Sequence, residues 1–416
     1  MTQPFKDPRK QAFLNPDGAD KPLESPLGPE VQERARRYRK SRLLAELARA
    51  DVGGMLLYDP INIRYATDVT NMQVWATHNP FHYALVFTSG YTIDFQYRGA
   101  EHLALAHGTV DEARSGTPWF YGMAGDRTAE NAKTWAAEVA DLVRRYGNGN
   151  RRLAVDKLEP LGTRALEALG IELVEGQALA ETARAIKSPD EIDLMRWTIR
   201  VAEAGMARMY ELSEPGRSEQ EIWAELHHEN ARSGGEWIET RLCTIGERTN
   251  PWFQECSAHV GKAGDMLAFD TDMIGPYGYC ADLSRSWTIG HVAMTNRQRD
   301  LYARALEQIE HNTALLAPGL DFRDFNERAW RLPDRYLANR YSCAVHGVGL
   351  ADEWPLVPTR TDFDKAHGGS FAAGMTVCVE SYLGEPGGPE GVKLETQVLI
   401  TDTGPVRLDS FPFEAH

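Results

Sequence analysis

Several features that would assign a chain to a specialised class of protein are absent from this sequence. Only five of its 416 residues are cysteines, and they are scattered without paired spacing. This odd number of buried-looking thiols argues against a disulfide framework and is typical of a reducing cytoplasm, where we expect the protein. The sequence also contains no internal repeat, no low-complexity tract and no apolar run long enough to cross a membrane.

Basic charge is in short supply as well. Lys and Arg number 45 against 60 Asp and Glu, which gives a formal net charge of -15. Such an acid excess repels phosphate, so we expect no nucleic-acid partner. Residues 1–30 are polar and proline-rich, without the basic and then apolar order of a secretory signal, and are expected to form a partly ordered arm. The length of the chain predicts two domains.

A small α/β domain is predicted over residues 31–182. Its first 20 residues are charged and rich in alanine, which favours a helix. A second helix is indicated by Trp135, Val139, Leu142, Val143 and Tyr146, which recur on one helical face. Short apolar runs predict strands at residues 54–58, 83–87, 92–95 and 153–156.

The second domain is predicted over residues 183–416. Ser188 is followed by proline and, three residues on, by Glu191, which is the pattern of a capping box at the start of a long amphipathic helix. Ser218 begins a second such pattern, and residues 296–316 predict a further helix. The intervening and closing segments are typical of strands. The expected fold class is α+β with a curved, largely antiparallel sheet.

The most informative feature is a set of acidic residues around one histidine in the last third of the chain. Most of these acids lie in apolar surroundings. Buried carboxylates repel one another unless a counter-charge of about four units joins them, which two divalent cations supply. Oxygen ligands with one imidazole suit iron, manganese or zinc. The sequence therefore predicts a dinuclear metal centre held by Asp270, Asp272, Asp282, His346, Glu380 and Glu395.

The first three of these acids are expected to meet in a hairpin. Asp270 and Asp272 are two residues apart on a predicted strand, so their side chains would point to the same face. Residues 275–278 contain two glycines and a proline and predict a turn. The chain would then return Asp282 to the same place.

The other three candidates come from later segments. His346 precedes a glycine-rich bend, where the backbone can approach a metal closely. Glu380 and Glu395 lie on two predicted strands that can face one cavity. Any single acid of the set could equally cap a helix or pair with a surface lysine, but all six in these contexts favour a metal centre.

Taken together, these motifs resemble the creatinase/aminopeptidase family of metalloenzymes, which have the pita-bread fold. The order of two aspartates, a histidine and two glutamates is shared, as are residues 185–192 and 282–286. The resemblance covers nearly the whole chain after residue 30. It implies a creatinase-like α/β domain in front of a pita-bread catalytic domain, and it implies a homodimer.

The sequence departs from the peptidases of that family at two histidines that serve substrate binding and proton transfer. One is replaced by Phe253, and the other, after the metal-bound histidine, is replaced by Glu353. The first aspartate is displaced as well, because Asp270 lies twelve residues before Asp282 and Asp272 ten before it. Asp272 is thus expected to be a sixth ligand or to replace an ordinary one.

One branch of the family shares these departures. Residues 64–68, 71–80, 234–241, 250–255 and 346–355 are similar to those of the DddP-type dimethylsulfoniopropionate (DMSP) lyases. The resemblance implies that the two metals are iron, that Asp352 is the catalytic base and that a small zwitterionic sulfonium is the substrate. The implied reaction is β-elimination to dimethyl sulfide and acrylate. Asp352 could alternatively be a loop aspartate that binds backbone amides.

A sulfonium group is recognised by aromatic faces, which attract cations. Four aromatic residues are candidates, although each could serve core packing instead. Tyr341 is favoured because it lies five residues before His346, and Trp75 is expected to reach the site across a dimer interface. The candidate substrate-binding residues are Tyr341, Trp354, Trp252 and Trp75.

Two other functions are compatible with the same fold. One is a metal-dependent C–N hydrolase, either an Xaa-Pro peptidase or a creatinase-like enzyme. The missing histidine pair argues against it, although Glu353 could supply a proton. The other is a binding module that has lost its metals. All the ligand positions are filled here, whereas a degenerate site would be expected to have lost some.

Overall fold

The computed structural model describes residues 6–15, 21–365 and 367–414, and these form two compact units. One unit spans residues 28–184. The other contains residues 185–414 together with the described residues up to Leu27. The arm predicted over residues 1–30 therefore groups with the second unit up to Leu27, and its residues 1–5 and 16–20 lie outside the described residues. Among the described residues, no helix has both the length and the apolar composition needed to cross a membrane.

The unit of residues 28–184 is built on a mixed six-stranded sheet with the order β4-β3-β2-β1-β5-β6. Each of the four predicted strands is present. The strands are β1 (Gly54–Leu57), β2 (Tyr83–Phe87), β3 (Thr92–Gln96), β4 (Glu112–Ser115), β5 (Arg152–Val155) and β6 (Glu172–Glu175). The helices are α2 (Pro29–Arg49), α3 (Pro60–Thr67), α4 (Gln73–Ala76), α5 (Glu101–Ala104), α6 (Tyr121–Ala124), α7 (Thr128–Tyr146), α8 (Pro160–Glu167) and α9 (Gln177–Ala185), with a 3-10 turn η1 (Gly125–Arg127).

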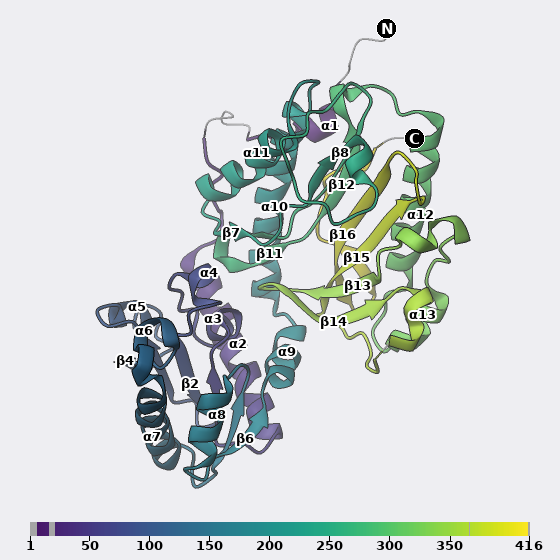
Figure 1. The fold of residues 1–416 in the computed structure, drawn as a ribbon. Helices are drawn as coiled ribbons and strands as arrows, with labels where there is room; N and C mark the ends of the chain where they lie inside the picture. Colours follow the sequence, from purple (N-terminus) through teal and green to yellow (C-terminus); the bar gives the residue numbers. More distant parts are fainter. Residues whose placement is uncertain (1–5, 16–20, 366, 415–416) are drawn as a thin grey trace. The chain divides into compact units, whose positions relative to one another are not determined.

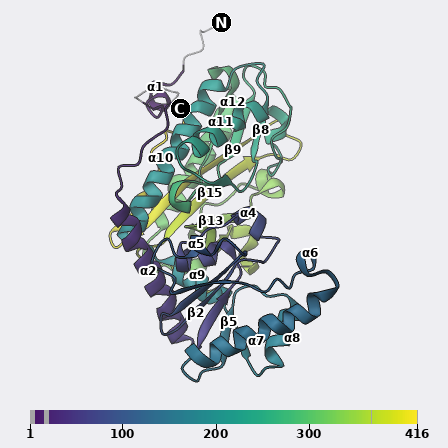
Figure 2. The ribbon, with the colours of Figure 1, turned by 90° about the vertical axis from the view of Figure 1, so that its left-hand side faces the viewer.

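The core of this unit lies between the sheet and α7. Trp135, Val139 and Val143 are fully or almost fully buried, and they pack against Leu85 and Phe95 of the central strands. This is the apolar helical face that the sequence predicts. Figure 2 shows α7 and α8 lying side by side in this unit.

The second unit opens with the two predicted capped helices. In α10 (Pro189–Leu212) the Ser188 hydroxyl accepts from the Glu191 amide and the Glu191 carboxylate accepts from the Ser188 amide. The same reciprocal pair at Ser218 and Glu221 starts α11 (Glu219–Arg232). The remaining helices are α1 (Pro8–Gln11), α12 (Asn296–Leu315) and α13 (Phe322–Arg328), and the 3-10 segments are η2 (Gly246–Thr249), η3 (Pro276–Gly278), η4 (Ile289–His291), η5 (Asp334–Asn339) and η6 (Arg360–Lys365).

Antiparallel strands carry the rest of this unit, as the α+β prediction requires. A five-stranded sheet has the order β14-β13-β15-β16-β17, and two three-stranded sheets have the orders β12-β9-β8 and β11-β10-β7. In Figure 1 the long strands β15 and β16 run beside α12. The strands are β7 (Trp237–Ile238), β8 (Cys243–Ile245), β9 (Met266–Asp270), β10 (Met273–Ile274), β11 (Cys280–Ala281), β12 (Ser284–Thr288), β13 (Cys343–Val348), β14 (Asp352–Pro358), β15 (Thr376–Gly384), β16 (Gly391–Thr401) and β17 (Gly404–Arg407).

Alternation along β15 and β16 separates a polar face from an apolar one. Val379 and Leu394 are completely buried in one apolar cluster with Tyr302 and Ile309 of α12. Their sequence neighbours therefore point to the opposite face. The main chain of Lys393 is bonded to the Ser286 hydroxyl of β12, which joins the five-stranded sheet to the sheet that contains β9.

Candidate metal centre

The strands bring the predicted acids together. Glu380 of β15 and Glu395 of β16 lie directly opposite each other in the antiparallel register. Asp270 is the last residue of β9 and pairs with Ser284 of β12, and Asp282 lies between β11 and β12. Because β12 packs on β16, these side chains point into one buried space.

Asp272 reaches this space by a different route from the one predicted. The sequence places it on one strand with Asp270, but β9 ends at Asp270 and Asp272 falls in the break before β10. Its φ of 35° lies in the left-handed region, so the chain turns sharply there. The expectation of a shared strand face is thus wrong, although both carboxylates lie close to Asp282. The Asp272 Oδ2 accepts a hydrogen bond of 2.6 Å from Thr240.

Three overlapping groups of side chains have the spacing that a metal ion needs. Within each group the donor atoms lie within 4.8 Å of one another, and all members are buried. Every one of the six predicted residues belongs to at least one group, and Cys378, which the sequence did not single out, joins the histidine group. The groups are Asp282, His346, Cys378 and Glu395; Asp270, Glu380 and Glu395; and Asp270, Asp272 and Asp282.

His346 is oriented as a metal-binding imidazole would be. Its Nε2 lies 3.4 Å from Asp282, 3.5 Å from Glu380 and 3.6 Å from Glu395. Its Nδ1 lies 3.0 Å from the carbonyl oxygen of Gly347, which can only accept. This contact assigns the proton of a neutral ring to Nδ1 and leaves the Nε2 lone pair facing the carboxylates.

The electrostatics of these groups call for additional positive charge. Burial raises the pKa of Asp282 well above its ordinary value, and the neighbouring Glu395, Asp272 and Asp270 raise it further. Burial lowers the pKa of His346, but Asp352, Glu380 and Glu395 more than reverse this, so the pKa lies well above normal. A positive charge at Nε2 is therefore strongly favoured.

Three buried carboxylate oxygens of the cluster make no hydrogen bond with any residue that the structure describes, namely Asp282 Oδ1, Glu380 Oε2 and Glu395 Oε1. Of these, Glu380 Oε2 forms an ion pair of 2.7 Å with Lys393. An ionised oxygen in that position is costly unless a cation compensates it. The donor set, the burial and these oxygens fit a metal site.

Lys393 is a member of the site that the sequence analysis missed. Its completely buried Nζ lies 2.7 Å from Glu380, 2.8 Å from Asp270 and 3.3 Å from Glu395. The ammonium group thus neutralises part of the carboxylate charge. One signal was available: Lys393 and Glu395 are two apart on a strand, so they share a face.

Two of the aromatic candidates surround that ammonium group. The Nζ of Lys393 lies 5.4 Å from the ring centroid of Tyr341 and 5.7 Å from that of Trp252. Phe253, at one of the substituted histidine positions, lies 5.3 Å from the Tyr341 ring and is 63% exposed. The rings of Tyr341 and Trp252 therefore do face a cation, but that cation is Lys393 of the chain itself.

Of the other two aromatic candidates, Trp354 is not brought to this cluster. The ring of Trp354 packs against Phe322 and His367, in the apolar cluster around α13. Trp75 belongs to the unit of residues 28–184, where it packs edge-on against Phe81 at 4.9 Å. The predicted substrate role of Trp75 stays a prediction.

Asp352 lies at the start of β14, beside the histidine. Its side chain is 51% exposed, and its Oδ1 lies 3.7 Å from His346 Nδ1. No backbone amide of the described residues donates to it, in contrast to the alternative of a loop aspartate bonded to amides. The carboxylate is therefore accessible to a small molecule while it remains next to the cluster.

The contacts of Glu353 argue against a role in proton transfer. Its carboxylate is buried, lies 2.8 Å from the Nζ of Lys187 and accepts a hydrogen bond from the Leu350 amide. These contacts tie the loop before Asp352 to the segment that precedes α10. Glu353 thus holds the position of Asp352 and is already engaged, so it is poorly placed to supply a proton.

Comparisons with known proteins agree with this geometry. The model of metallopeptidase family M24 matches residues 193–402. The chain is 44% identical over 395 residues to the dimethylsulfoniopropionate lyase DddP of Roseovarius nubinhibens, covering 93% of this chain and 88% of that one. It is 42% identical over 390 residues to the lyase of the same name from Roseobacter denitrificans, covering 91% and 86%.

The fold is also that of solved structures. An Xaa-Pro dipeptidase from Bacillus anthracis superposes with a TM-score of 0.71 and 21% identity, covering 91% of this chain and 99% of that one. Since the identity is low, this likeness concerns the fold alone. The family match, the near full-length relatives and the buried carboxylates together identify the chain as a member of metallopeptidase family M24, a family of metal-dependent enzymes with the pita-bread fold.

Proposed function

We propose that the protein is a metal-dependent lyase that cleaves dimethylsulfoniopropionate by β-elimination to dimethyl sulfide and acrylate. The observation that carries this proposal is the 44% identity to a lyase of that name over 93% of the chain. The replacement of both peptidase histidines, by Phe253 and Glu353, supports the same conclusion. We further propose that the protein acts as a homodimer in the cytoplasm.

His346 and the five buried carboxylates around it would hold two divalent ions, for which we propose iron. Carboxylate oxygens and one imidazole suit iron, manganese or zinc alike. When bound, the metals supply Lewis acidity that stabilises negative charge on the carboxylate of the substrate. The residues of the chain that hold them are also expected to exclude water from that part of the site, because all six are buried.

Asp352 would be the base. It is accessible and next to the cluster, so it can reach the carbon beside the substrate carboxylate. Asp352 takes the proton from that carbon, and the freed electron pair becomes the C=C bond of acrylate. The C–S bond breaks, its electron pair leaves on sulfur, and neutral dimethyl sulfide departs without consumption of water.

The sulfonium end is proposed to lie against Tyr341 and Phe253, with Trp252 behind them. Lys393 already occupies one side of the Tyr341 and Trp252 rings, and it would repel a second cation there. The exposed Phe253 leaves a second aromatic surface next to Tyr341 that faces solvent. We therefore expect the sulfonium on the Phe253 side of Tyr341.

The second candidate is a C–N hydrolase, which the fold of the Xaa-Pro dipeptidase keeps open. A hydrolase needs a group that transfers a proton in place of the absent histidines. The sequence offers Glu353 for that role, but its carboxylate is engaged with Lys187 and the Leu350 amide. This contact favours the lyase.

The test is headspace gas chromatography of purified protein of known metal content, incubated with dimethylsulfoniopropionate or, in parallel, with an Xaa-Pro dipeptide. We expect dimethyl sulfide with an equimolar amount of acrylate and no dipeptide cleavage. If the dipeptide is cleaved and no sulfide appears, the hydrolase replaces the lyase. The metal assay on the same sample tests the proposal of two ions per chain.

A further inference from the structure

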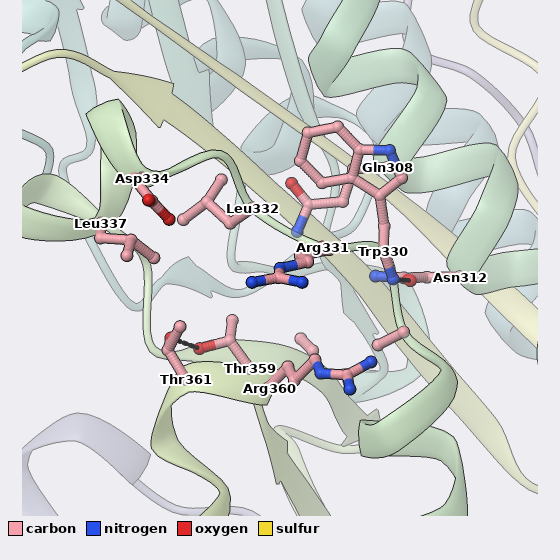
Figure 3. Close-up of a pocket in the computed structure, with 12 residues that line it drawn as sticks. Gln308, Asn312, Trp330, Arg331, Leu332, Asp334, Leu337, Thr359, Arg360 and Thr361 are labelled. Atoms are coloured by element: carbon pink, nitrogen blue, oxygen red, sulfur yellow. Dashed lines mark hydrogen bonds between the residues drawn. The ribbon is translucent and has the colours of Figure 1, made fainter.

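A second cavity lies in the same unit, on the face of the five-stranded sheet that packs against α12. Its volume is about 280 Å³, which is the share of liquid volume of roughly nine water molecules. The wall is formed by α12, by residues 329–337 and by residues 359–361 after β14 (Figure 3). None of the candidate metal ligands lines it.

The polar groups that face this cavity are mainly donors. Figure 3 shows the guanidinium of Arg331 pointing into the space, and Arg331 has no ion-pair partner within the described part of the chain. Arg360 lies at the same cavity and donates to the carbonyl oxygen of Glu327. Two guanidinium groups against the single carboxylate of Asp334 make the cavity cationic.

A buried donor adds to this set. Asn312 is only 1% exposed, its Oδ1 accepts from the Trp330 amide at 2.8 Å, and its Nδ2 has no hydrogen-bond partner among the described residues. That hydrogen bond fixes the orientation of the side-chain amide, so the donor Nδ2 is the atom that remains without an acceptor. A buried amide N–H without an acceptor costs free energy that a ligand oxygen would recover.

Part of the wall is apolar, although Gln308, Thr359 and Thr361 add further polar groups to it. Trp330, Leu332, Leu337 and Ala344 supply a surface for a small hydrocarbon body. A site with apolar walls and a few convergent polar groups is typical of small-molecule recognition. The carboxylate of Asp334 on the same wall disfavours multiply charged anions such as phosphate.

From these groups we infer that the cavity is a binding site for a small monocarboxylate with an apolar body. The carboxylate is bound by Arg331 and Arg360 and receives the Asn312 Nδ2 hydrogen bond, and the body packs against Trp330 and Leu332. The site is distinct from the candidate metal centre and does not depend on the proposed lyase activity.

The test is calorimetric titration of the as-purified enzyme with benzoate, beside benzamide, which has the same shape without the charge. Benzoate is expected to bind at least tenfold more tightly than benzamide. Arg331→Gln is expected to weaken benzoate binding at least tenfold, whereas Arg323→Gln, a substitution of an exposed arginine on α13, changes it less than twofold.

A carboxylate can also bind to metal ions, so a second variant separates the two sites. In Asp282→Asn, where the metal centre is disrupted, benzoate binding is expected to persist. Binding that is lost in Asp282→Asn and kept in Arg331→Gln would place benzoate at the metals and overturn the inference, as would the absence of binding to the unsubstituted enzyme. Inorganic phosphate that binds more tightly than benzoate would equally contradict the monocarboxylate assignment.

Discussion

The two faces of the sheet formed by β14, β13, β15, β16 and β17 collect opposite charges. One face carries Glu380 and Glu395 beside His346, where three buried carboxylate oxygens make no hydrogen bond with the described residues. The other face meets α12, and behind it lies a cavity that contains two arginines and an amide donor without an acceptor. The acidic face thus favours the binding of a cation, and the cavity favours the binding of an anion.

Two consecutive residues of β15 enter these two environments, the acidic cluster and the side that faces α12. Glu380 points to the acidic cluster, while the hydroxyl of the next residue, Ser381, donates 2.9 Å to Gln308 of α12, which lines the cavity. Strand alternation is sufficient to keep the two charges apart. The difference teaches that the face of a strand decides which of the two environments its side chains enter, with a layer of apolar side chains such as Val379 packed against α12.

The largest effect on the difference between the two faces is expected when the proposed metal ions are removed from the acidic face. Asp282→Asn replaces a carboxylate shared by two of the three ligand groups. We expect loss of at least one metal ion per chain and a fall in lyase activity of roughly ten-thousandfold, since several kcal/mol of charge stabilisation disappear with it. Metal analysis and sulfide release measure the two effects, with the exposed Asp402→Asn as control. Full metal content in Asp282→Asn would refute its role as a ligand.

Asp352→Asn tests the accessible acid beside the cluster. The amide cannot accept the proton, so activity should fall about a thousandfold, within the 10²–10⁴ range for general bases. Metal content should stay unchanged, because Asp352 lies 3.7 Å from the Nδ1 of His346, on the side away from the three carboxylates. Loss of metal together with activity would instead make Asp352 a ligand. Partial recovery in Asp352→Glu would support the role of base.

Lys393→Met tests the cation that the chain itself supplies. Removing the ammonium from Asp270, Glu380 and Glu395 leaves buried carboxylates without a partner, and we expect the metal-free protein to lose about 3 kcal/mol of unfolding free energy. The metal-loaded protein should lose less, because the ions supply replacement charge. Urea unfolding with and without chelator measures both values, and Lys262→Met at an exposed site is the control. Equal losses in the two states would contradict this account.

The acidic face could be predicted from sequence to a large extent because it consists of local patterns. Glu380 and Glu395 fall inside apolar runs that read as strands, and the Gly and Pro residues between Asp272 and Asp282 indicate the turn. Asp272 itself was misplaced, since a residue in the left-handed region breaks a strand without any sign in the side-chain pattern. Lys393 was overlooked because a lone lysine usually indicates a solvated face, and only the folded structure shows its ammonium group to be buried beside Glu380.

The cationic cavity could not be predicted in the same way. Asn312, Arg331 and Arg360 come from a helix and two loops, and their meeting depends on how those loops fold back on α12. Asn312 looks like an ordinary helical residue in the sequence, and it becomes informative only when the Trp330 amide is seen to take its oxygen. The aromatic candidates show the same limit, because the surroundings of Trp354 and Tyr341 are set by tertiary packing.

A half-buried acid that has no ion-pair partner among the described residues sharpens the comparison further, although its expected effect is the smallest. Asp156, in the unit of residues 28–184, accepts from the amides of Tyr58 and Asp59 and from Asn62, and burial still raises its pKa to about 6. The folded chain therefore holds this proton more tightly than the unfolded chain, whose pKa is near the ordinary 3.8. The stability contributed by the protonated form is complete below about pH 4 and is lost as the pH rises through 6.

Between pH 5 and pH 7 the difference in unfolding free energy between the wild type and Asp156→Asn should accordingly fall by about 1 kcal/mol. Urea titrations at several pH values measure this difference, in which the titration of groups unaffected by the substitution cancels. A difference that rises with pH would mean that the amide donors outweigh burial and that the pKa of Asp156 is depressed. The contrast between Asp156 and the carboxylates around His346, for which we propose compensating cations, would then disappear.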